Sequence, residues 1–280
     1  MPKISVIGIC GNSIFMTVDS FHESGQTVVA KDTFEEIGGK GINQAVAAVR
    51  MGAEVSFLAA IGDDADGQKC RQTAAENGIE GHFAVKQGMR TTFAFILTDK
   101  NGENRVTEYV GAELTIADVL NFENQIAQSD ILLLQHEVPV DVNETAIAIA
   151  AKHGVKVILN PAPIREINRS LADKIFAVIP NEHEKQGLVG MEFQNCITTL
   201  GKDGCSINDT EFIKALPVEA VDTTGAGDTF NGVLAVCLAE GMDMKTACRY
   251  AVTASGISVT KHCVLASIPK RNEIERMIVL

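Results

Sequence analysis

The sequence predicts an α/β fold built on a mainly parallel sheet. From Ile116 onward, short apolar runs alternate with segments of helix length, which is typical of strand–helix–strand units with helices on both sheet faces. Two glycine-rich turns, at 38–41 and 225–227, each lead into an apolar run at helical spacing. No linker, repeat or low-complexity tract divides the 280 residues, so we expect one domain, residues 1–280.

The first part of the chain is expected to supply several strands and two helices. Residues 3–9 alternate and are rich in β-formers, which predicts a first strand, and more polar strands are expected at 14–18 and 26–34. The first glycine turn then opens a helix. The remaining elements are a buried strand at 55–61, an amphipathic helix at 64–77, and a hairpin of 93–98 and 105–109 around 99–103.

The second part supplies the alternating elements. Strands are expected at 131–134, 155–159, 175–179 and 197–200, and helices at 140–152, 225–240 and 244–259. In such folds, ligands bind where strands end and helices begin. Polar residues stand at these ends, in segments 135–137, 160–163, 181–184 and 198–204. Each segment taken singly is explained as well by a helix cap or a turn, and Asn181 with Glu184 comes close to a capping box.

Composition excludes several classes of protein. The chain is 46% apolar and 21% charged, as in globular proteins, and no apolar run approaches the ~18 residues of a membrane span. A net charge of −12 argues against a nucleic-acid surface, which needs clustered Lys and Arg. Seven cysteines without a C-x-x-C pair indicate reduced thiols. The N-terminal residues lack signal-peptide features, so we expect a cytoplasmic protein without membrane partners.

The segment 221–232 carries the clearest chemical signal. Its residues Gly225, Ala226 and Gly227 begin a helix whose first N–H groups have no intrahelical partner and attract an oxyanion or phosphate. Asp228, in the first turn of that helix, would repel a phosphate unless it accepts a proton from the group that attacks the phosphate. We therefore interpret Asp228 as a general base in phosphoryl transfer. The alternative is a carboxylate that only stabilises the helix dipole.

Two other phosphate-binding motifs are excluded by the residues present. A dinucleotide fingerprint would need a third glycine at position 230, where this chain has Phe230. A Walker-type loop would need Ser or Thr after Lys40, but Gly41 follows it. Lys40 between glycines suits close approach to a polar ligand, and a solvated lysine in a tight turn explains the pattern equally well.

Five segments together resemble the ribokinase branch of the phosphofructokinase-B-type (pfkB) sugar kinases. They are 38–49, 160–163, 181–184, 199–201 and 222–232, and the resemblance runs from about Ile4 to Ile274. Both glycine motifs match nearly letter for letter, in the right order and separation. The resemblance implies a three-layer α/β/α domain with a small β-sheet lid from about 12–36 and 91–110. It also implies transfer of the ATP γ-phosphate to a sugar hydroxyl and a homodimer formed through the lid strands.

The resemblance further implies roles for individual residues. By position, Asp228 is similar to the base that takes the hydroxyl proton, and Gly225, Ala226 and Gly227 to the anion hole for the transferring phosphoryl group. The residues that match the sugar site are Gly11, Ser13, Gly39, Lys40, Gly41, Asn43, Glu137 and Asp228. Those that match the ATP site are Asn181, Glu184, Thr199, Leu200, Gly201, Lys202, Asp203, Gly204 and Gly227, with Glu184 reaching Mg²⁺ through water. The residues that fall where the family binds an activating monovalent cation such as K⁺ are Asp222, Thr224, Ser258, Lys261, Cys263 and Ser267.

Three departures from the family's pattern bear on function. Ribokinases have Asn-x-Asp after the first strand, but this chain has Gly11-Asn12-Ser13, so a bidentate acceptor becomes a single hydroxyl, a change large enough to alter which sugar is preferred. Only residues 182–197 separate Asn181 from the next strand, which predicts a thinner helix layer on one sheet face. Residues 263–266 replace a glycine-led, more polar segment, so we expect weak cation dependence.

Three functions stay open at the level of the sequence. The first is an ATP-dependent kinase that acts on a furanose or a related polyol. The second keeps this chemistry but uses a nucleoside or a sugar phosphate as acceptor. The third is a non-catalytic sensor of sugars or nucleotides, which the intact Asp228 disfavours.

Overall fold

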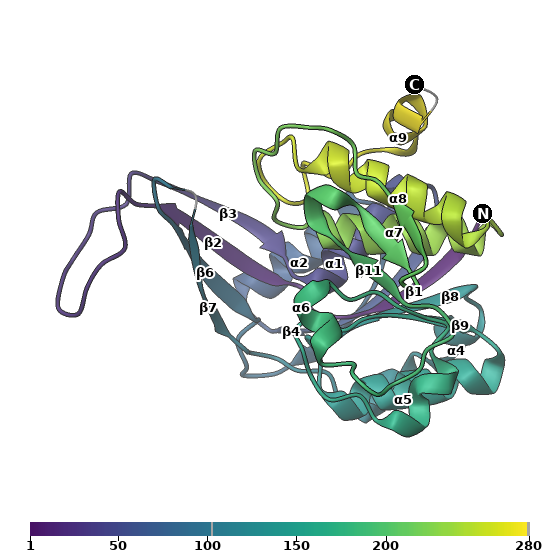
Figure 1. Cartoon of the computed structure of the whole chain (residues 1–280). Coiled ribbons are helices and arrows are strands. Elements are labelled where there is room, and N and C mark those ends of the chain that lie inside the picture. The colour runs from purple at the N-terminus through teal and green to yellow at the C-terminus, as the bar shows by residue number, and fades with distance from the viewer. Residues whose placement is uncertain (102, 279–280) are drawn as a thin grey trace.

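The centre of the fold is a six-stranded parallel sheet with strand order β10-β9-β8-β1-β4-β5 (Figure 1). Its strands are β1 (Lys3–Ile7), β4 (Glu54–Gly62), β5 (Glu80–Lys86), β8 (Ile131–Gln135), β9 (Lys156–Asn160) and β10 (Ala177–Val178). The computed structural model describes residues 1–101 and 103–278. Gly102, within the predicted hairpin turn at 99–103, and residues 279–280 at the end of the predicted domain lie outside the described residues.

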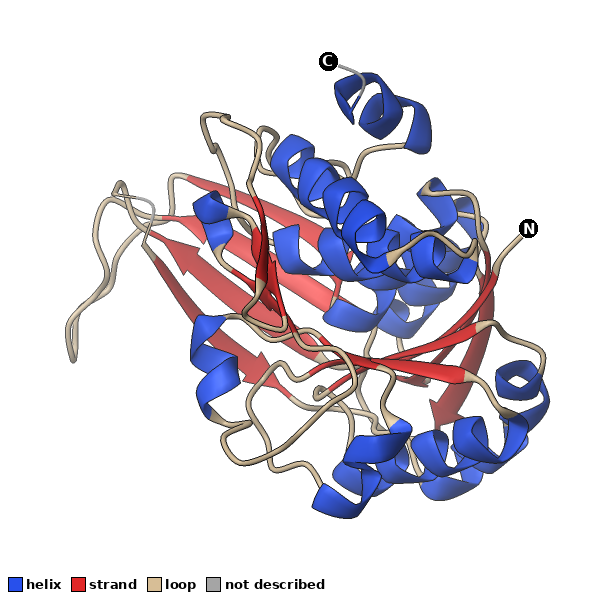
Figure 2. Cartoon of the chain, turned by 45° about the vertical axis from the view of Figure 1, so that its right-hand side comes forward, coloured by secondary structure: helices blue, strands red, loops and turns tan. Residues whose placement is uncertain are grey.

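Helices cover both faces of this sheet (Figure 2). One face packs against α1 (Lys40–Arg50), α2 (Ala65–Glu76), α7 (Ala226–Ala239), α8 (Met244–Ser258) and α9 (Arg271–Ile278). The other packs against α3 (Ile116–Asn121), α4 (Glu123–Ala127), α5 (Val140–His153) and a 3-10 helix (Arg169–Lys174). Ile131 and Leu133 of β8 enter the first core while Leu132 and Leu134 enter the second, because successive side chains of a strand point to opposite faces. The predicted parallel sheet with two covered faces is therefore confirmed.

No helix within residues 1–101 and 103–278 is long and apolar enough to cross a membrane.

A second, four-stranded sheet projects from one end of the parallel sheet (Figure 1, purple and teal strands). Its order is β3-β2-β6-β7, formed by β2 (Gly11–Thr17), β3 (Asp32–Gly38), β6 (Phe93–Thr98) and β7 (Asn104–Tyr109). Ser13, Glu36, Ala94 and Glu108 pair across the strands in one row. Since side chains of one row share a face, these four residues lie on the same side of the sheet.

The prediction of a strand at 26–34 is wrong for most of these residues. The ladder between β2 and β3 begins only at the pair Thr17 and Asp32, and the residues before Asp32 form a long loop. Val29, a strong β-former, is 86% exposed in this loop. Residues with high β-propensity form a strand only where a neighbouring strand supplies hydrogen bonds and a packing surface.

A third, antiparallel sheet consists of β11 (Ile197–Thr199), β12 (Cys205–Ile207) and β13 (Glu211–Ile213). The first of these strands was expected to continue the parallel sheet, but it touches that sheet only through isolated parallel bridges, Val178 with Cys196 and Asn181 with Thr199. The crossover before β11 holds one short helix, α6 (Glu182–Gln186), which buries none of its residues. The helix layer is accordingly thin here, as the short connection predicts.

Candidate active site

The carboxyl ends of the parallel strands and the two glycine turns meet at one edge of the sheet. The end of β1 lies directly against the first turn of α1, since a Cβ atom on Gly41 would stand 2.8 Å from the backbone of Gly8. A side chain at either position would push α1 away from the sheet. The early glycine motif therefore lets the start of α1 approach the strand ends closely.

A cleft lies between this edge and the four-stranded sheet. It consists of two adjoining cavities of about 510 Å³ and about 280 Å³. Lys40 and Glu137 line both cavities, together with Ile9, Thr92 and Glu108. The predicted site residues that line the smaller cavity are Gly11, Ser13, Gly39, Lys40, Asn43, Glu137, Thr224, Gly225 and Asp228. The fold thus brings residues from both glycine motifs, from β8 and from the four-stranded sheet to one cleft.

Asp228 is held rigidly at the start of α7. The helix begins after Gly225, whose φ of 74° is in the left-handed region that favours glycine, and no side chain caps its first N–H groups. Asp228 is 7% exposed. Its Oδ2 accepts a hydrogen bond from Asn43 Nδ2 at 2.9 Å and its Oδ1 accepts one from Gln44 Nε2 at 3.0 Å. Each carboxylate oxygen keeps a further lone pair for another donor.

A buried amide network supports this carboxylate from behind. Gln44 Oε1 accepts a hydrogen bond from Gln135 Nε2 at 2.7 Å, and Gln44 Nε2 also lies 3.3 Å from Asn160 Oδ1. Asn143 Nδ2 in turn donates to the backbone oxygen of Gln135 at 2.7 Å. The network joins α1, β8, β9 and α5, so the orientation of Asp228 depends on four elements.

The sequence interpretation missed this network. Gln44 lay inside the early glycine motif without a role, and Gln135 and Asn160 were noted only as residues at strand ends. The available signal was the polar pair Asn43-Gln44 at the start of an otherwise apolar helix, because buried amides in such a position need partners.

We expect Gln44→Leu to lower the turnover of this site by about 10- to 100-fold, because a hydrogen bond to a charged group contributes about 1.5–3 kcal/mol. The substitution keeps the side-chain volume but leaves Asp228 Oδ1 without its amide donor. Steady-state kcat measures the effect, and Gln72→Ala, on the exposed face of α2, is the matched control. A Gln44→Leu enzyme with kcat within twofold of the unmodified protein would contradict the positioning role.

Lys40 and Glu137 form a partly buried ion pair inside the cleft. The backbone N–H of Lys40 donates to Glu137 Oε2 at 2.8 Å, and Lys40 Nζ lies 3.7 Å from Glu137 Oε1. Burial is the main cause that raises the pKa of Glu137 to about 7; the ammonium of Lys40 opposes this shift and the charge of Asp228 adds to it. Burial alone would lower the pKa of Lys40, but the carboxylates of Asp228, Glu137 and Glu184 outweigh it, so this pKa is raised.

The residues that match an ATP site meet the larger cavity through Glu184. The capping box at the start of α6 is present: Asn181 N–H donates to Glu184 Oε2 at 2.9 Å, and Glu184 N–H donates to Asn181 Oδ1 at 2.8 Å. Glu184 lines the cavity, and Thr199 bridges to Asn181. The loop 199–204 closes on itself, with Leu200 N–H bonded to Gly204 O at 2.8 Å. Its members Gly201, Lys202 and Asp203 form a single exposed 3-10 turn.

The residues that match a cation site come from two segments that lie side by side. The N–H groups of Val221 and Asp222 both donate to Val259 O, at 2.7 and 3.1 Å. Thr224 N–H donates to Asp222 Oδ1 at 2.9 Å. In the second segment, Ser258 O accepts from Lys261 N–H and Val264 O accepts from the Ser267 hydroxyl.

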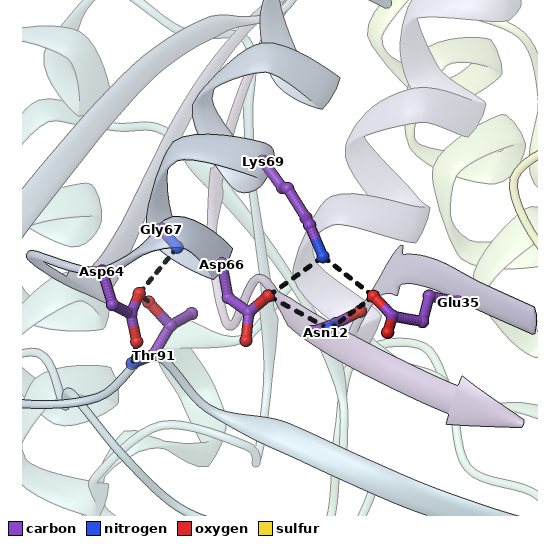
Figure 3. A network of polar contacts seen from close by, with 7 residues as sticks. All are labelled: Asn12, Glu35, Asp64, Asp66, Gly67, Lys69 and Thr91. Atoms are coloured by element: carbon purple, nitrogen blue, oxygen red, sulfur yellow. Dashed lines mark hydrogen bonds and ion pairs between the residues drawn. The ribbon is translucent and has the colours of Figure 1, made fainter.

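Asn12 lines the smaller cavity, but its side-chain amide is turned toward α2. Its Nδ2 donates to Glu35 Oε2 at 3.2 Å and to Asp66 Oδ1 at 3.1 Å, and Lys69 bridges the same two carboxylates (Figure 3). This network, with the neighbouring contacts of Asp64, ties the four-stranded sheet to α2. Ser13 is therefore the side chain of the Gly11-Asn12-Ser13 segment that offers a polar group to the cleft.

Comparison with known proteins places this geometry in a family. Residues 1–271 match the pfkB family carbohydrate kinase model. The ribokinase of Haemophilus influenzae is 36% identical, over 96% of this chain and 96% of its own length. The crystal structure of ribokinase from Thermotoga maritima is 32% identical and superposes with a TM-score of 0.89 over 100% of both chains. The Arabidopsis thaliana ribokinase complexed with ribose and ATP is 25% identical, with a TM-score of 0.88 over 100% of this chain and 99% of that one.

This chain belongs to the pfkB family of carbohydrate kinases. The resemblance inferred from its two glycine motifs is confirmed, and so is the ribokinase-like α/β/α fold. As a pfkB kinase, the protein is a phosphotransferase whose acceptor is a sugar hydroxyl.

Proposed function

We propose that this pfkB kinase transfers the γ-phosphate of ATP to a hydroxyl of a small neutral sugar, with Asp228 as the general base. The observation that carries the proposal is the position of Asp228, buried at the uncapped start of α7, with both oxygens oriented by amide donors and facing a cleft. The N–H of Ala226 donates to Thr223 O at 3.3 Å. A hydroxyl held against Asp228 would lie next to the N–H groups of Gly225 and Gly227. These groups stabilise the charge on the phosphoryl group during its transfer, while Asp228 takes the hydroxyl proton.

The charges of the smaller cavity favour a neutral sugar over a sugar phosphate. Its wall holds the carboxylates of Glu36, Glu108, Glu137 and Asp228 against the ammonium of Lys40. A phosphorylated acceptor would meet net repulsion there, because like charges in a partly desolvated cleft are screened poorly by water. Lys40, Asn43 and Glu137 would hold the hydroxyls of a neutral sugar.

The four-stranded sheet favours an acceptor other than ribose. A Cβ atom on Gly11 would lie 2.3 Å from Thr92 O, so no side chain fits at that position. With Asn12 turned toward α2, Ser13 contributes one hydroxyl where the ribokinase pattern has an amide and a carboxylate. We propose that the sugar presents fewer or differently placed hydroxyls to this sheet than ribose does.

ATP as the donor is supported by the likeness to the Arabidopsis ribokinase complexed with ribose and ATP. Glu184 fits Mg²⁺ through bound water, because each of its oxygens accepts one hydrogen bond from Asn181 and keeps a lone pair on the cavity side. The ion would neutralise charge on the ATP phosphates. The weak cation dependence expected from residues 263–266 stays a prediction.

Several coarser expectations stay predictions. These are a single kinase domain over residues 1–280 with β2, β3, β6 and β7 as its lid, a homodimer through that lid, and a cytoplasmic location. A non-catalytic sensor is disfavoured by the supporting network around Asp228, since a protein that only binds ligand has no need of an oriented base.

An ATP-coupled assay across pentoses, hexoses, polyols, nucleosides and sugar phosphates tests the proposal. We expect ADP formation with at least one neutral sugar, a weaker response to ribose than to that sugar, and none with sugar phosphates. Mass measurement of the product identifies the added phosphoryl group. If ATP is not consumed with any acceptor, while sugars or nucleotides raise the Tm, the protein is a sensor and the kinase proposal is wrong.

A further inference from the structure

A carboxylate of the four-stranded sheet holds the loop that follows α8. Glu36, on β3, accepts hydrogen bonds with both oxygens: Oε2 from Val264 N–H and Oε1 from Leu265 N–H, each at 2.8 Å. Glu36 shares its cross-strand row with Ser13 and lines the smaller cavity. Glu36 lies outside the five segments that carry the family resemblance, and the residues that meet are 228 and 229 positions apart.

The loop is strained at the residue before this contact. Cys263 has a φ of 67°, in the left-handed region that non-glycine residues rarely adopt. Successive N–H groups next to such a residue form a concave pair of donors that suits an anion. The Glu36 carboxylate fills this concavity, so its two charge-assisted hydrogen bonds offset the strain at Cys263.

The loop that Glu36 binds contacts the phosphate-binding turn at the start of α7. A Cβ atom on Gly225 would lie 2.4 Å from Val264 Cγ1, so the Val264 side chain packs directly on the residue that begins α7. On the opposite side of the loop, Arg50 Nη1 donates to Leu265 O at 2.5 Å and to Ile268 O at 2.7 Å. Since the peptide bond is planar and trans, fixing Val264 N–H also fixes the direction of the Cys263 carbonyl.

We propose that Glu36 is a positioning residue that couples the sugar-binding sheet to the phosphate-binding turn of α7. Both of its oxygens bind the loop, so the carboxylate acts on the reaction through Val264 and Gly225 and not as a ligand of the sugar. The kinetic part of this inference rests on the proposed function. The structural part, that Glu36 holds the strained loop, does not.

The first measurement is amide hydrogen exchange at Val264 and Leu265, which needs neither sugar nor ATP. We expect both amides to exchange about tenfold faster or more in Glu36→Ala, because each loses a charge-assisted hydrogen bond. Glu36→Gln keeps one acceptor oxygen, so its exchange rates should lie between those of the unmodified protein and those of Glu36→Ala. Asp32→Asn, which removes the same charge from an exposed position on the same face of β3, should leave both rates unchanged.

The second measurement is a rescue. We expect Glu36→Ala to lower kcat by about tenfold, and Cys263→Gly in the same chain to restore at least half of that loss on a logarithmic scale. Glycine adopts the positive φ without strain, so the loop no longer depends on the carboxylate. The kcat of Cys263→Gly alone is the reference against which the double variant is compared.

Either of two results would overturn the inference. Unchanged exchange at Val264 and Leu265 in both Glu36 variants would show that the carboxylate does not hold the loop. A rise in the sugar KM that Cys263→Gly does not relieve would make Glu36 a ligand of the sugar. If the amides exchange faster in the Glu36 variants while the unmodified protein phosphorylates no sugar, this result would contradict the proposed function but support the structural role of Glu36.

Discussion

Asp228→Asn is expected to lower kcat for sugar phosphorylation by about 10²- to 10⁴-fold, the range of a lost general base. The amide has nearly the shape of the carboxylate but cannot take the proton of the attacking hydroxyl. Its remaining oxygen can still accept a hydrogen bond from Asn43 or Gln44, so the start of α7 should keep its structure. The KM for ATP should change little, because the proposed nucleotide residues other than Gly227 belong to other elements. Coupled ADP release measures kcat, and calorimetry measures ATP binding.

The matched control for this variant is Asp173→Asn, which removes one exposed carboxylate outside the cleft. It should retain full activity. Should Asp228→Asn keep kcat within tenfold of the unmodified enzyme, Asp228 would be a helix-dipole residue and another group would accept the proton.

Glu137→Gln is expected to lower kcat/KM for the sugar by about 10- to 100-fold at pH 8, because hydrogen bonds to a charged group contribute about 1.5–3 kcal/mol. The ionised carboxylate accepts a hydrogen bond from Lys40 and, in the proposed function, would accept others from the sugar, whereas a protonated carboxyl group is a weaker acceptor. With the pKa of Glu137 at about 7, kcat/KM of the unmodified enzyme should rise between pH 6 and pH 8. The variant should lose this rise, and Glu192→Gln, an exposed residue outside the cleft, should keep it.

The same group predicts how stability depends on pH. Because the folded-state pKa of Glu137 is raised from 4.5 to about 7, its proton binds more tightly in the folded state. The contribution to stability is therefore fully present below about pH 4.5 and is lost as the pH rises through 7. Relative to Glu137→Gln, the unmodified protein should lose up to about 3 kcal/mol of unfolding free energy between pH 4.5 and pH 8. Urea unfolding of both proteins at the two pH values measures this difference, and parallel curves would contradict it.

The elements that the sequence predicted best are those fixed by local chemistry. The helix expected at 64–77 is α2 with Asp64 as its N-cap, accepting a hydrogen bond from Gly67 N–H at 2.8 Å, and Asn77 as its C-cap. Both glycine turns begin helices as expected, because glycine readily adopts the positive φ that Gly39 and Gly225 have at the helix starts. The strand β5 and the helix α9 were not predicted. β5 is an edge strand with no fully buried residue, so its pairing with β4 decides its structure.

The site shows the same division between local and long-range information. Asp228 stood out because a carboxylate beside an anion-binding helix start conflicts with a purely structural role. Lys40 and Glu137 were assigned to the site through the family resemblance. The residues that position the site did not stand out. Gln44 meets Asp228 across 184 positions, and Glu36 meets Val264 across 228. Such pairs exist only once the sheet order is fixed, and hydrophobic periodicity carries no information about them.

The short α6 has a consequence for the way the molecule opens. The border between β10 and β11 holds one five-residue helix and two isolated bridges, and it runs beside Asn181 and Glu184. Regions with few buried contacts open first, long before the chain as a whole unfolds. If nucleotide binds beside Asn181 and Glu184 as proposed, it would contact both sides of this border, and local opening there should be rarer with nucleotide bound than after product release.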